Sequence, residues 1–150
     1  MSKVVTLASE WIGTPYHHQA SLKGAGTDCL GLIRGIWREL YGTEPETPSP
    51  YSQTWGDYNK RETMLEAAER NLEKVAMVSD RRYIPDPRQV HWEPGAILFL
   101  RRLPGAVAKH CAILSGDDSI IHAYSGVGVR ETSVGIWDKH VAGIFRFPGY

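Results

Sequence analysis

The stretch DCLGLIRGIWRELYG, residues 28–42, is the part of the chain from which the fold is most directly inferred. Asp28 is a favourable N-cap residue, and Gly42 is a favourable residue for ending a helix. Gly31 and Gly35 lie one turn apart inside the stretch, where a glycine costs about 1 kcal/mol relative to alanine. This pair predicts that another backbone packs closely on the helix, which is therefore central. Its apolar residues recur at the helical period and form one inner stripe: Leu30, Ile33, Trp37 and Leu40.

Two further helices are predicted on either side of this central one. Residues 3–12 carry apolar side chains at the helical period, and the run Gly13-Thr14-Pro15 ends that helix. Residues 61–76 predict a third helix, and loops are expected at residues 16–27, 42–58 and 79–93, where glycine or proline recurs. The inner face of the third helix is expected to consist of Leu65, Ala68, Leu72 and Val75.

The second half of the chain has the character of a β-sheet. Short β-prone runs follow one another at residues 96–100, 110–114, 119–124, 127–132 and 141–147, separated by turn residues. Helices first and strands afterwards favour an α+β fold in which N-terminal helices pack on a C-terminal antiparallel sheet. A length of 150 residues without an internal repeat predicts a single domain over residues 1–150.

Composition narrows the function classes. The 17 basic and 17 acidic side chains balance, so no nucleic-acid partner is expected. No apolar run reaches the roughly 20 residues that a membrane span needs, so no membrane insertion is expected. Glu10 and Trp11 interrupt the apolar start before a signal-peptide core can form. We therefore expect a protein made in the cytoplasm that depends on another carrier if it acts elsewhere.

The two cysteines, Cys29 and Cys111, are too few for a disulfide scaffold. One bridge, two buried thiols, or one buried and one reactive thiol remain open. Cys29 follows the predicted N-cap, where the helix dipole favours thiolate and the carboxylate of Asp28 opposes it. Its pKa should fall only if a histidine is close. The glycine-bearing loop before Cys29 offers backbone amides and access, which favours the reactive thiol.

Two histidines are expected to meet on the sheet. Residues 116–118 predict the hairpin turn between their strands. Pairing Leu114 with Ile120 makes His110 diagonal to His122, and the neighbouring allowed register pairs the two histidines directly. In both registers the imidazoles share one face, so one can hydrogen-bond to the other. A thiol, a base and a residue that orients the base together support nucleophilic catalysis.

Five short motifs follow one another along the chain: Gly13-Thr14-Pro15-Tyr16, Asp28-Cys29-Leu30-Gly31-Leu32, Pro94-Gly95, His110-Cys111-Ala112-Ile113-Leu114 and Ile121-His122-Ala123. This ordered set resembles the NlpC/P60 family of papain-like cysteine peptidases. The resemblance implies a papain-like α+β fold with the nucleophile at the start of the central helix. It further implies that Cys29 is the nucleophile, His110 the base and His122 the third, polar member. Tyr16 and Asp28 would line the substrate cleft, and Tyr16 would help to stabilise the oxyanion.

The resemblance also implies a substrate and a route to it. Members of this family hydrolyse the stem peptides of bacterial peptidoglycan, here with the bond between γ-D-glutamate and the diamino acid as the expected site. No metal or other cofactor is implied. The compact form resembles members encoded among phage tail genes or in gene transfer agents. That likeness implies phage-like tail proteins as partners, and delivery by a particle to the periplasm or cell wall.

Three departures from the family pattern bear on the substrate pocket. Leu30 stands where the family usually has serine, and Ala96 stands where it usually has aspartate. Residues 17–20, His-His-Gln-Ala, replace a Trp-Gly-Gly-like run.

Alternative functions remain at this stage. An amidase or acyltransferase would use the same residues on another acyl bond, and a non-catalytic tail-structural protein would keep only the fold. A zinc module is a third alternative, but the candidate ligands lack the tight spacing of such sites: His17, His18, His110, Cys111 and His122.

Overall fold

The computed structural model describes residues 2–48, 61–77, 93–103, 105–135 and 140–150. Loops are expected at residues 42–58 and 79–93, and of these residues 49–58 and 79–92 lie outside the described ranges. In the described residues the helices are α1 (Lys3–Ser9), α2 (Cys29–Tyr41) and α3 (Thr63–Asn71). The strands are β1 (Ser21–Leu22), β2 (Gly26–Thr27), β3 (Glu73–Met77), β4 (Ile97–Arg101), β5 (Ala108–Leu114), β6 (Ser119–Tyr124), β7 (Gly128–Ser133) and β8 (Val141–Arg146).

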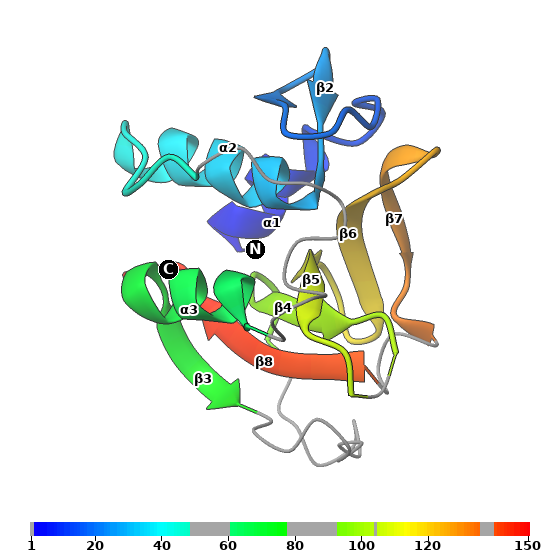
Figure 1. Ribbon diagram of the computed structural model, residues 1–150. Helices are drawn as coiled ribbons and strands as arrows, with labels where there is room; N and C mark the ends of the chain where they lie inside the picture. Colours follow the sequence, from blue (N-terminus) through cyan, green and yellow to red (C-terminus); the bar gives the residue numbers. More distant parts are fainter. Residues whose placement is uncertain (1, 49–60, 78–92, 104, 136–139) are drawn as a thin grey trace.

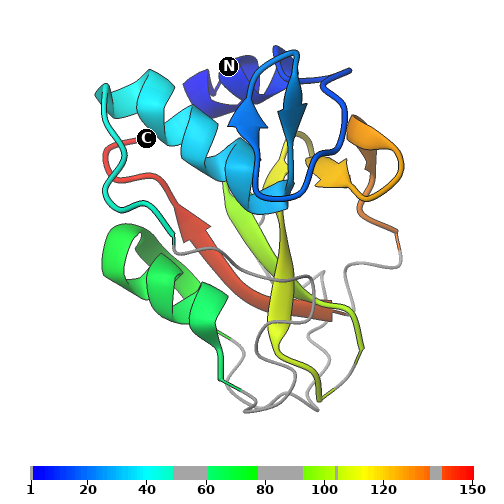
Figure 2. The same cartoon turned by 45° about the horizontal axis from the view of Figure 1, so that its top comes forward.

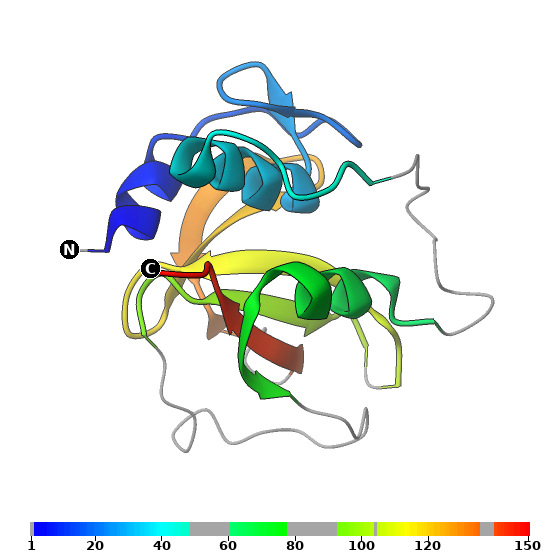
Figure 3. The same ribbon diagram turned by 90° about the vertical axis from the view of Figure 1, so that its left-hand side faces the viewer.

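The main sheet has six antiparallel strands in the order β3-β8-β4-β5-β6-β7, and β1 and β2 form a separate small hairpin (Figure 1). Helices α1 and α2 lie on one side of this sheet (Figure 3). The predicted α+β class with an antiparallel sheet is confirmed. No helix in the described ranges combines the length and the apolar character needed to cross a membrane.

The core between helices and sheet follows the alternation of side chains along the strands. The helix-facing residues of the sheet include Phe99, Cys111, Ile113 and Phe145, which are buried against α1, α2 and α3. The intervening strand residues form a second buried cluster on the other face: Ala96, Leu98, Leu100, Ala112, Leu114, Ile120, Val141 and Ile144. Both faces of the central strands are therefore apolar, which explains their nearly continuous hydrophobic sequence.

Helix α2 begins and ends where the sequence predicts. The Oδ1 atom of Asp28 accepts a hydrogen bond from the backbone N–H of Gly31 at 2.7 Å, which caps the first turn. Gly42 ends the helix in the left-handed conformation, with φ of 87°. The β1–β2 hairpin, which lies within the expected loop of residues 16–27, packs against the N-terminal half of α2 (Figure 2).

The two glycines inside α2 are both sites of close approach, but the predicted backbone neighbour is found only at Gly31. A Cβ atom on Gly31 would lie 2.0 Å from the carbonyl oxygen of Ala20, so the neighbour there is backbone. A Cβ atom on Gly35 would lie 2.1 Å from the indole of Trp11, so the neighbour there is a buried side chain of the turn after α1. Helix α2 is thus held from two sides by contacts that leave no room for a methyl group.

The predicted helix over residues 61–76 is wrong in its second half. Helix α3 ends at Asn71, and residues 73–77 form β3 instead. Val75, expected on an inner helix face, is 51% exposed. The cause is tertiary: β3 pairs with β8, and Glu73 lies opposite Arg146 across the strand pair. Pairing with a strand that is distant in the sequence here outweighs the helical period of the local residues.

Candidate active site

Cys29 is the first residue of α2, and it touches β5 on both sides of His110. Its Sγ atom lies 3.7 Å from the carbonyl oxygen of Lys109. In return, the Sγ atom of Cys111 donates to the carbonyl oxygen of Cys29 at 3.3 Å. The two residues flanking His110 in the chain therefore both contact Cys29, and this fixes the start of α2 against the strand that carries His110.

His110 and His122 contact each other directly. The Nε2 atom of His110 lies 2.8 Å from the Nδ1 atom of His122. Strands β5 and β6 pair Leu114 with Ile120, which is the first of the two registers predicted from the sequence. This ladder extends only to the pair Ile113–Ile121 within the described strands, so the imidazoles bridge the strands beyond the backbone pairing.

Thr132, on β7, completes this chain of polar side chains. The Nε2 atom of His122 lies 3.1 Å from the Oγ1 atom of Thr132. Burial, and then the charge of His110, lowers the pKa of His122 to about 4, so His122 is neutral near pH 7. With Nε2–H of His110 donating to His122, and Nε2–H of His122 donating to Thr132, the Nδ1 atom of His110 carries the lone pair that can accept a proton.

The neighbours of Cys29 lower the pKa of its thiol and so favour the thiolate. A hydrogen bond from the thiol of Cys111 has the largest effect, and hydrogen bonding and charge from His110 add to it. These effects outweigh burial and the Asp28 carboxylate and lower the pKa of Cys29 to about 5. The sequence analysis expected a histidine as the cause of this fall, whereas His110 only adds to the larger effect of Cys111. The hydrogen bond with Cys29, followed by burial and the charge of Cys29, raises the pKa of Cys111, which stays a neutral thiol.

The carboxylate of Asp28 accepts more hydrogen bonds from the backbone than the sequence indicates. The residue is 2% exposed, and besides Gly31 its carboxylate accepts a hydrogen bond from the backbone N–H of Gln19 at 2.8 Å. Gln19 adopts a left-handed conformation with φ of 65°, uncommon for a residue with a Cβ. The Nδ1 atom of His18 lies 3.9 Å from the same carboxylate oxygen. Asp28 thus joins the loop at residues 17–20 to the start of α2.

Tyr16 lies near Cys29 and Asp28. Partial burial, followed by the charges of Cys29 and Asp28, raises its pKa to about 12, so its hydroxyl remains a hydrogen-bond donor at neutral pH. The backbone of Tyr16 is bridged to Thr27 immediately before the capped helix. The structure therefore brings together all five residues singled out from the sequence, with Cys29 and His110 at the centre.

Tyr124 is a further residue at this site that the sequence analysis did not identify. Its ring centroid lies 6.3 Å from that of His110 and 5.8 Å from that of His122, and the residue is 44% exposed. It follows His122 by two positions on β6, so strand alternation places both on one face. Tyr124 covers the histidine pair and leaves part of its own surface open toward solvent.

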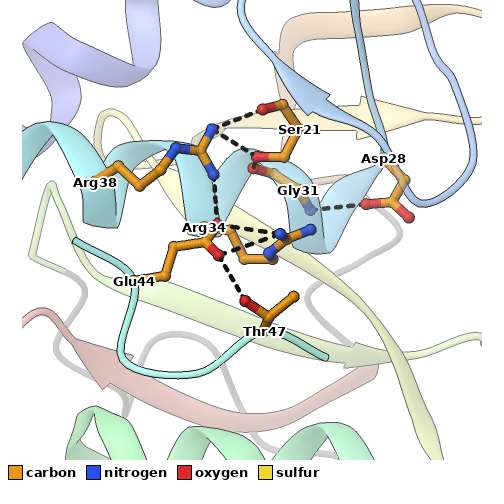
Figure 4. A network of polar contacts seen from close by, with 7 residues as sticks. All are labelled: Ser21, Asp28, Gly31, Arg34, Arg38, Glu44 and Thr47. Atoms are coloured by element: carbon orange, nitrogen blue, oxygen red, sulfur yellow. Dashed lines mark hydrogen bonds and ion pairs between the residues drawn. The ribbon is translucent and has the colours of Figure 1, made fainter. Parts of the chain in front are cut away.

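A polar network along α2 supports the hairpin and the segment after the helix (Figure 4). Arg38 donates to the carbonyl oxygen of Ser21 at 2.6 Å, and the Ser21 hydroxyl donates to the carbonyl oxygen of Gly31 at 2.6 Å. Arg34 and Arg38 both bind the carboxylate of Glu44. Burial raises the pKa of Glu44, but the two arginines outweigh it and hold that pKa below its usual value. The network holds in place the strands that lead to Asp28.

The residues considered for a zinc site are only partly brought together. His17 and His18 belong to the loop next to Asp28, where a ring nitrogen of His17 lies 3.4 Å from the carbonyl oxygen of His18. Over the described residues no group of three or more histidine, cysteine, aspartate or glutamate side chains is arranged to hold a metal ion. The geometry at Cys29 is instead that of a thiolate beside an oriented imidazole, which is suited to attack on an acyl carbon.

Several solved structures share this fold. The NlpC/p60 domain of the peptidoglycan hydrolase SagA matches with a TM-score of 0.57 and 22% identity, over 96% of this chain and 96% of that one. An NlpC/P60 family protein from Bacillus cereus gives a TM-score of 0.64 and 19% identity, over 96% of this chain and 39% of its own. NlpC1 from Trichomonas vaginalis gives 0.61 and 17%, over 97% and 43%.

The chain thus spans about two fifths of the two longer proteins and nearly all of the isolated domain. No curated protein sequence matches it. The family model described as the NlpC/P60 family matches residues 13–146, which include Cys29, His110 and His122. This match covers most of the chain, and it agrees with the motifs and with the fold: the chain belongs to the NlpC/P60 family of cysteine peptidases.

Proposed function

We propose that this protein hydrolyses the stem peptides of bacterial peptidoglycan, with Cys29 as the nucleophile, His110 as the base and His122 as the residue that orients the base. One observation carries the proposal. Cys29 stands at the N-terminus of α2 beside His110, and His110 is held by His122 at 2.8 Å. The name of one structural neighbour, the peptidoglycan hydrolase SagA, supports the same class of substrate.

The geometry supports a two-step acyl transfer. The thiolate of Cys29 attacks the carbonyl carbon of the scissile bond, and the protonated His110 gives its proton to the leaving amine. Water then attacks the thioester while His110 accepts the proton of that water. His122 keeps the ring of His110 in one orientation through both steps, because Thr132 fixes His122 from its other side.

The oxyanion formed in each step needs hydrogen-bond donors. We assign this role to the Tyr16 hydroxyl together with the backbone N–H groups of the first turn of α2. Those amides lie at the positive end of the helix dipole, which favours a developing negative charge. The raised pKa of Tyr16, about 12, keeps its donor proton in place throughout the pH range of interest.

The bond between γ-D-glutamate and the diamino acid is the proposed site of cleavage, and this assignment rests on the family resemblance. In this proposal Asp28 pairs with the free amine of a short stem peptide, at the carboxylate oxygen that faces Gln19 and His18. The phenol of Tyr16 binds a backbone carbonyl of the same peptide.

Delivery by a phage-like particle completes the proposal and rests on the resemblance of the sequence to family members encoded among phage tail genes or in gene transfer agents. The protein would be made in the cytoplasm, be built into the particle with tail proteins, and act in the periplasm or cell wall. Immunogold labelling of isolated particles tests this part separately from the chemistry, since labelled tails support it and unlabelled tails contradict it.

The enzymatic proposal is tested by incubating the purified protein with defined stem peptides and identifying the products by mass spectrometry. We expect cleavage after γ-D-glutamate by the wild type and none by Cys29→Ala. Release or transfer of another acyl group, with an intact stem, would favour the amidase or acyltransferase. No Cys29-dependent product on any stem would favour the non-catalytic tail protein.

A further inference from the structure

The two cysteines of this chain come from distant parts of the sequence and meet beneath the proposed active site. The chain has 2 cysteines in all, and both are free thiols. The sulfur of Cys111 is fully buried and lies 3.3 Å from the carbonyl oxygen of Cys29. Cys29 is 8% exposed, so the nucleophile stands between solvent and the second thiol.

Geometry permits a bond between the two sulfurs. A disulfide forms without large backbone movement only where the side chains of both cysteines already share one contact region. Here the Cys111 sulfur touches the backbone of residue 29 itself, and the start of α2 is fixed against β5 on both sides of His110. The Cys111 thiol also hydrogen-bonds to the Cys29 sulfur, so the two sulfur atoms are already neighbours in the reduced protein.

The two thiols differ in their reactivity toward an oxidant. Cys29 is converted toward thiolate, the form that reacts with oxidants, whereas Cys111 remains a thiol shielded from solvent. An isolated cysteine sulfenic acid is open to further, irreversible oxidation. A second thiol in contact with the sulfenic acid converts it faster into a disulfide, which can be reduced again.

We propose that Cys111 is a resolving cysteine, which forms a disulfide with Cys29 when a hydroperoxide oxidises the nucleophile, and so reversibly switches the enzyme off. This proposal rests on Cys29 being the reactive thiol of the proposed function. It assigns to Cys111 a role in the regulation and protection of that thiol.

The chemistry balances with a hydroperoxide as the only oxidant. The Cys29 thiolate attacks the outer peroxide oxygen, the O–O bond breaks, and Cys29 sulfenic acid forms as an alkoxide or hydroxide leaves and takes a proton from water. The Cys111 sulfur then attacks the sulfenic sulfur, so an S–S bond forms and the S–O bond breaks. The hydroxide that leaves takes the proton of Cys111 and departs as water. The two thiols lose two electrons, and the peroxide is reduced.

The test treats the reduced protein with a small excess of hydrogen peroxide and follows intact mass, peptide mass and activity. The wild type should lose the mass of two hydrogen atoms, yield a Cys29–Cys111 cross-linked peptide, and regain nearly all activity with dithiothreitol. Cys111→Ser keeps a hydroxyl donor to the Cys29 carbonyl, but it should gain oxygen atoms on Cys29 and regain almost no activity. Each protein is compared with its own untreated activity.

Three results would overturn the proposal: oxygen gain on wild-type Cys29 without a cross-link, a cross-link between two chains instead of within one, or equal recovery of wild type and Cys111→Ser. Cys29→Ser serves as a control in which Cys111 should remain unmodified. If Cys111→Ser fails to fold, the wild-type peptide map alone decides. Because the cross-link is read by mass, it can form in a protein without stem-peptide hydrolysis, so the two proposals can fail independently.

Discussion

The Nε2 atom of His110 lies 2.8 Å from the Nδ1 atom of His122, at a place where strands β5 and β6 no longer pair through their backbones. There, hydrogen bonds between side chains take the place of backbone pairing. They continue from His122 to Thr132 on the next strand, β7. The orientation of the base therefore depends on side-chain hydrogen bonds across three neighbouring strands.

The buried His122 should make stability depend on pH. Its pKa is lowered from 6.5 to about 4 in the fold, so between these values the unfolded chain binds more protons than the folded one. The free energy of unfolding contributed by His122 is complete above pH 6.5 and falls by about 3 kcal/mol as the pH is lowered through 4. Urea unfolding measured from pH 4 to 7 should show a shallower pH dependence in His122→Asn. The exposed His17, changed to Asn, is the control and should keep the wild-type slope.

Alkylation by iodoacetamide should report the thiolate of Cys29. We expect the rate to rise with pH to a half-maximal value near pH 5, where the lowered pKa of Cys29 lies, and peptide mapping to find the label on Cys29. In His110→Ala the midpoint should move to higher pH, because a hydrogen bond and a positive charge are lost. Label on Cys111 with Cys29 unmodified would show that the nucleophile is misassigned.

Asp28→Asn should lower the stability of the fold. Both carboxylate oxygens accept backbone N–H groups, from Gly31 and from Gln19, and an amide places an NH₂ group against one of them. The loss should be about 1–3 kcal/mol in urea unfolding. Asp117→Asn, at an exposed position of the β5–β6 turn, is the matched control and should be close to wild type.

The same variant tests whether Asp28 also binds substrate. If Asp28 pairs with a free stem amine, kcat/KM should fall about tenfold or more on short stems with that amine, since a charge-assisted hydrogen bond is lost. Stems still joined to glycan lack the amine and should be affected much less. Equal losses on both substrates would assign Asp28 to the helix cap and the loop at residues 17–20 alone.

Gly35→Ala should destabilise the protein although alanine favours helix. The new Cβ would lie 2.1 Å from the buried Trp11 ring, and such overpacking costs about 1–3 kcal/mol. Combining it with Trp11→Leu should cost less than the sum of the two single changes, because the smaller side chain makes room. Additive losses in thermal or urea unfolding would show that contact with Trp11 is not the reason for glycine at position 35.

Chelators should leave hydrolysis unchanged, since thiolate, imidazole and amide donors carry every step of the proposed mechanism. Activity should be the same with and without EDTA and should be lost after alkylation of Cys29. Loss with EDTA, restored by zinc, together with resistance to alkylation, would favour the zinc module instead.

Local signals in the sequence predicted those parts of the site that local structure determines. Asp28 and Gly42 bound α2 because capping depends on residues within one turn. The register that brings His110 diagonal to His122 follows from a short turn, closed by a hydrogen bond from the N–H of Ser115 to the carbonyl oxygen of Ser119.

Features that depend on residues distant in the sequence could not be predicted from such local signals. Residues 73–77 read as helix because their partner, β8, lies some seventy positions away in the chain. Thr132 lies beside His122 only because β6 pairs with β7. The residues next to Thr132 in the sequence give no indication of this contact. The nearness of Cys111 to Cys29 likewise follows from the packing of a helix on a sheet.

The contacts of Cys29 with Lys109 and Cys111 have a consequence for how heating inactivates this protein. Nucleophile and base are joined through the neighbours of His110, so a local opening of the surface loops cannot separate them. Their separation requires the interface between α2 and β5, which is part of the main core, to open. Loss of catalysis and loss of tertiary structure should therefore occur in one thermal transition, and a folded but inactive form should not accumulate below it.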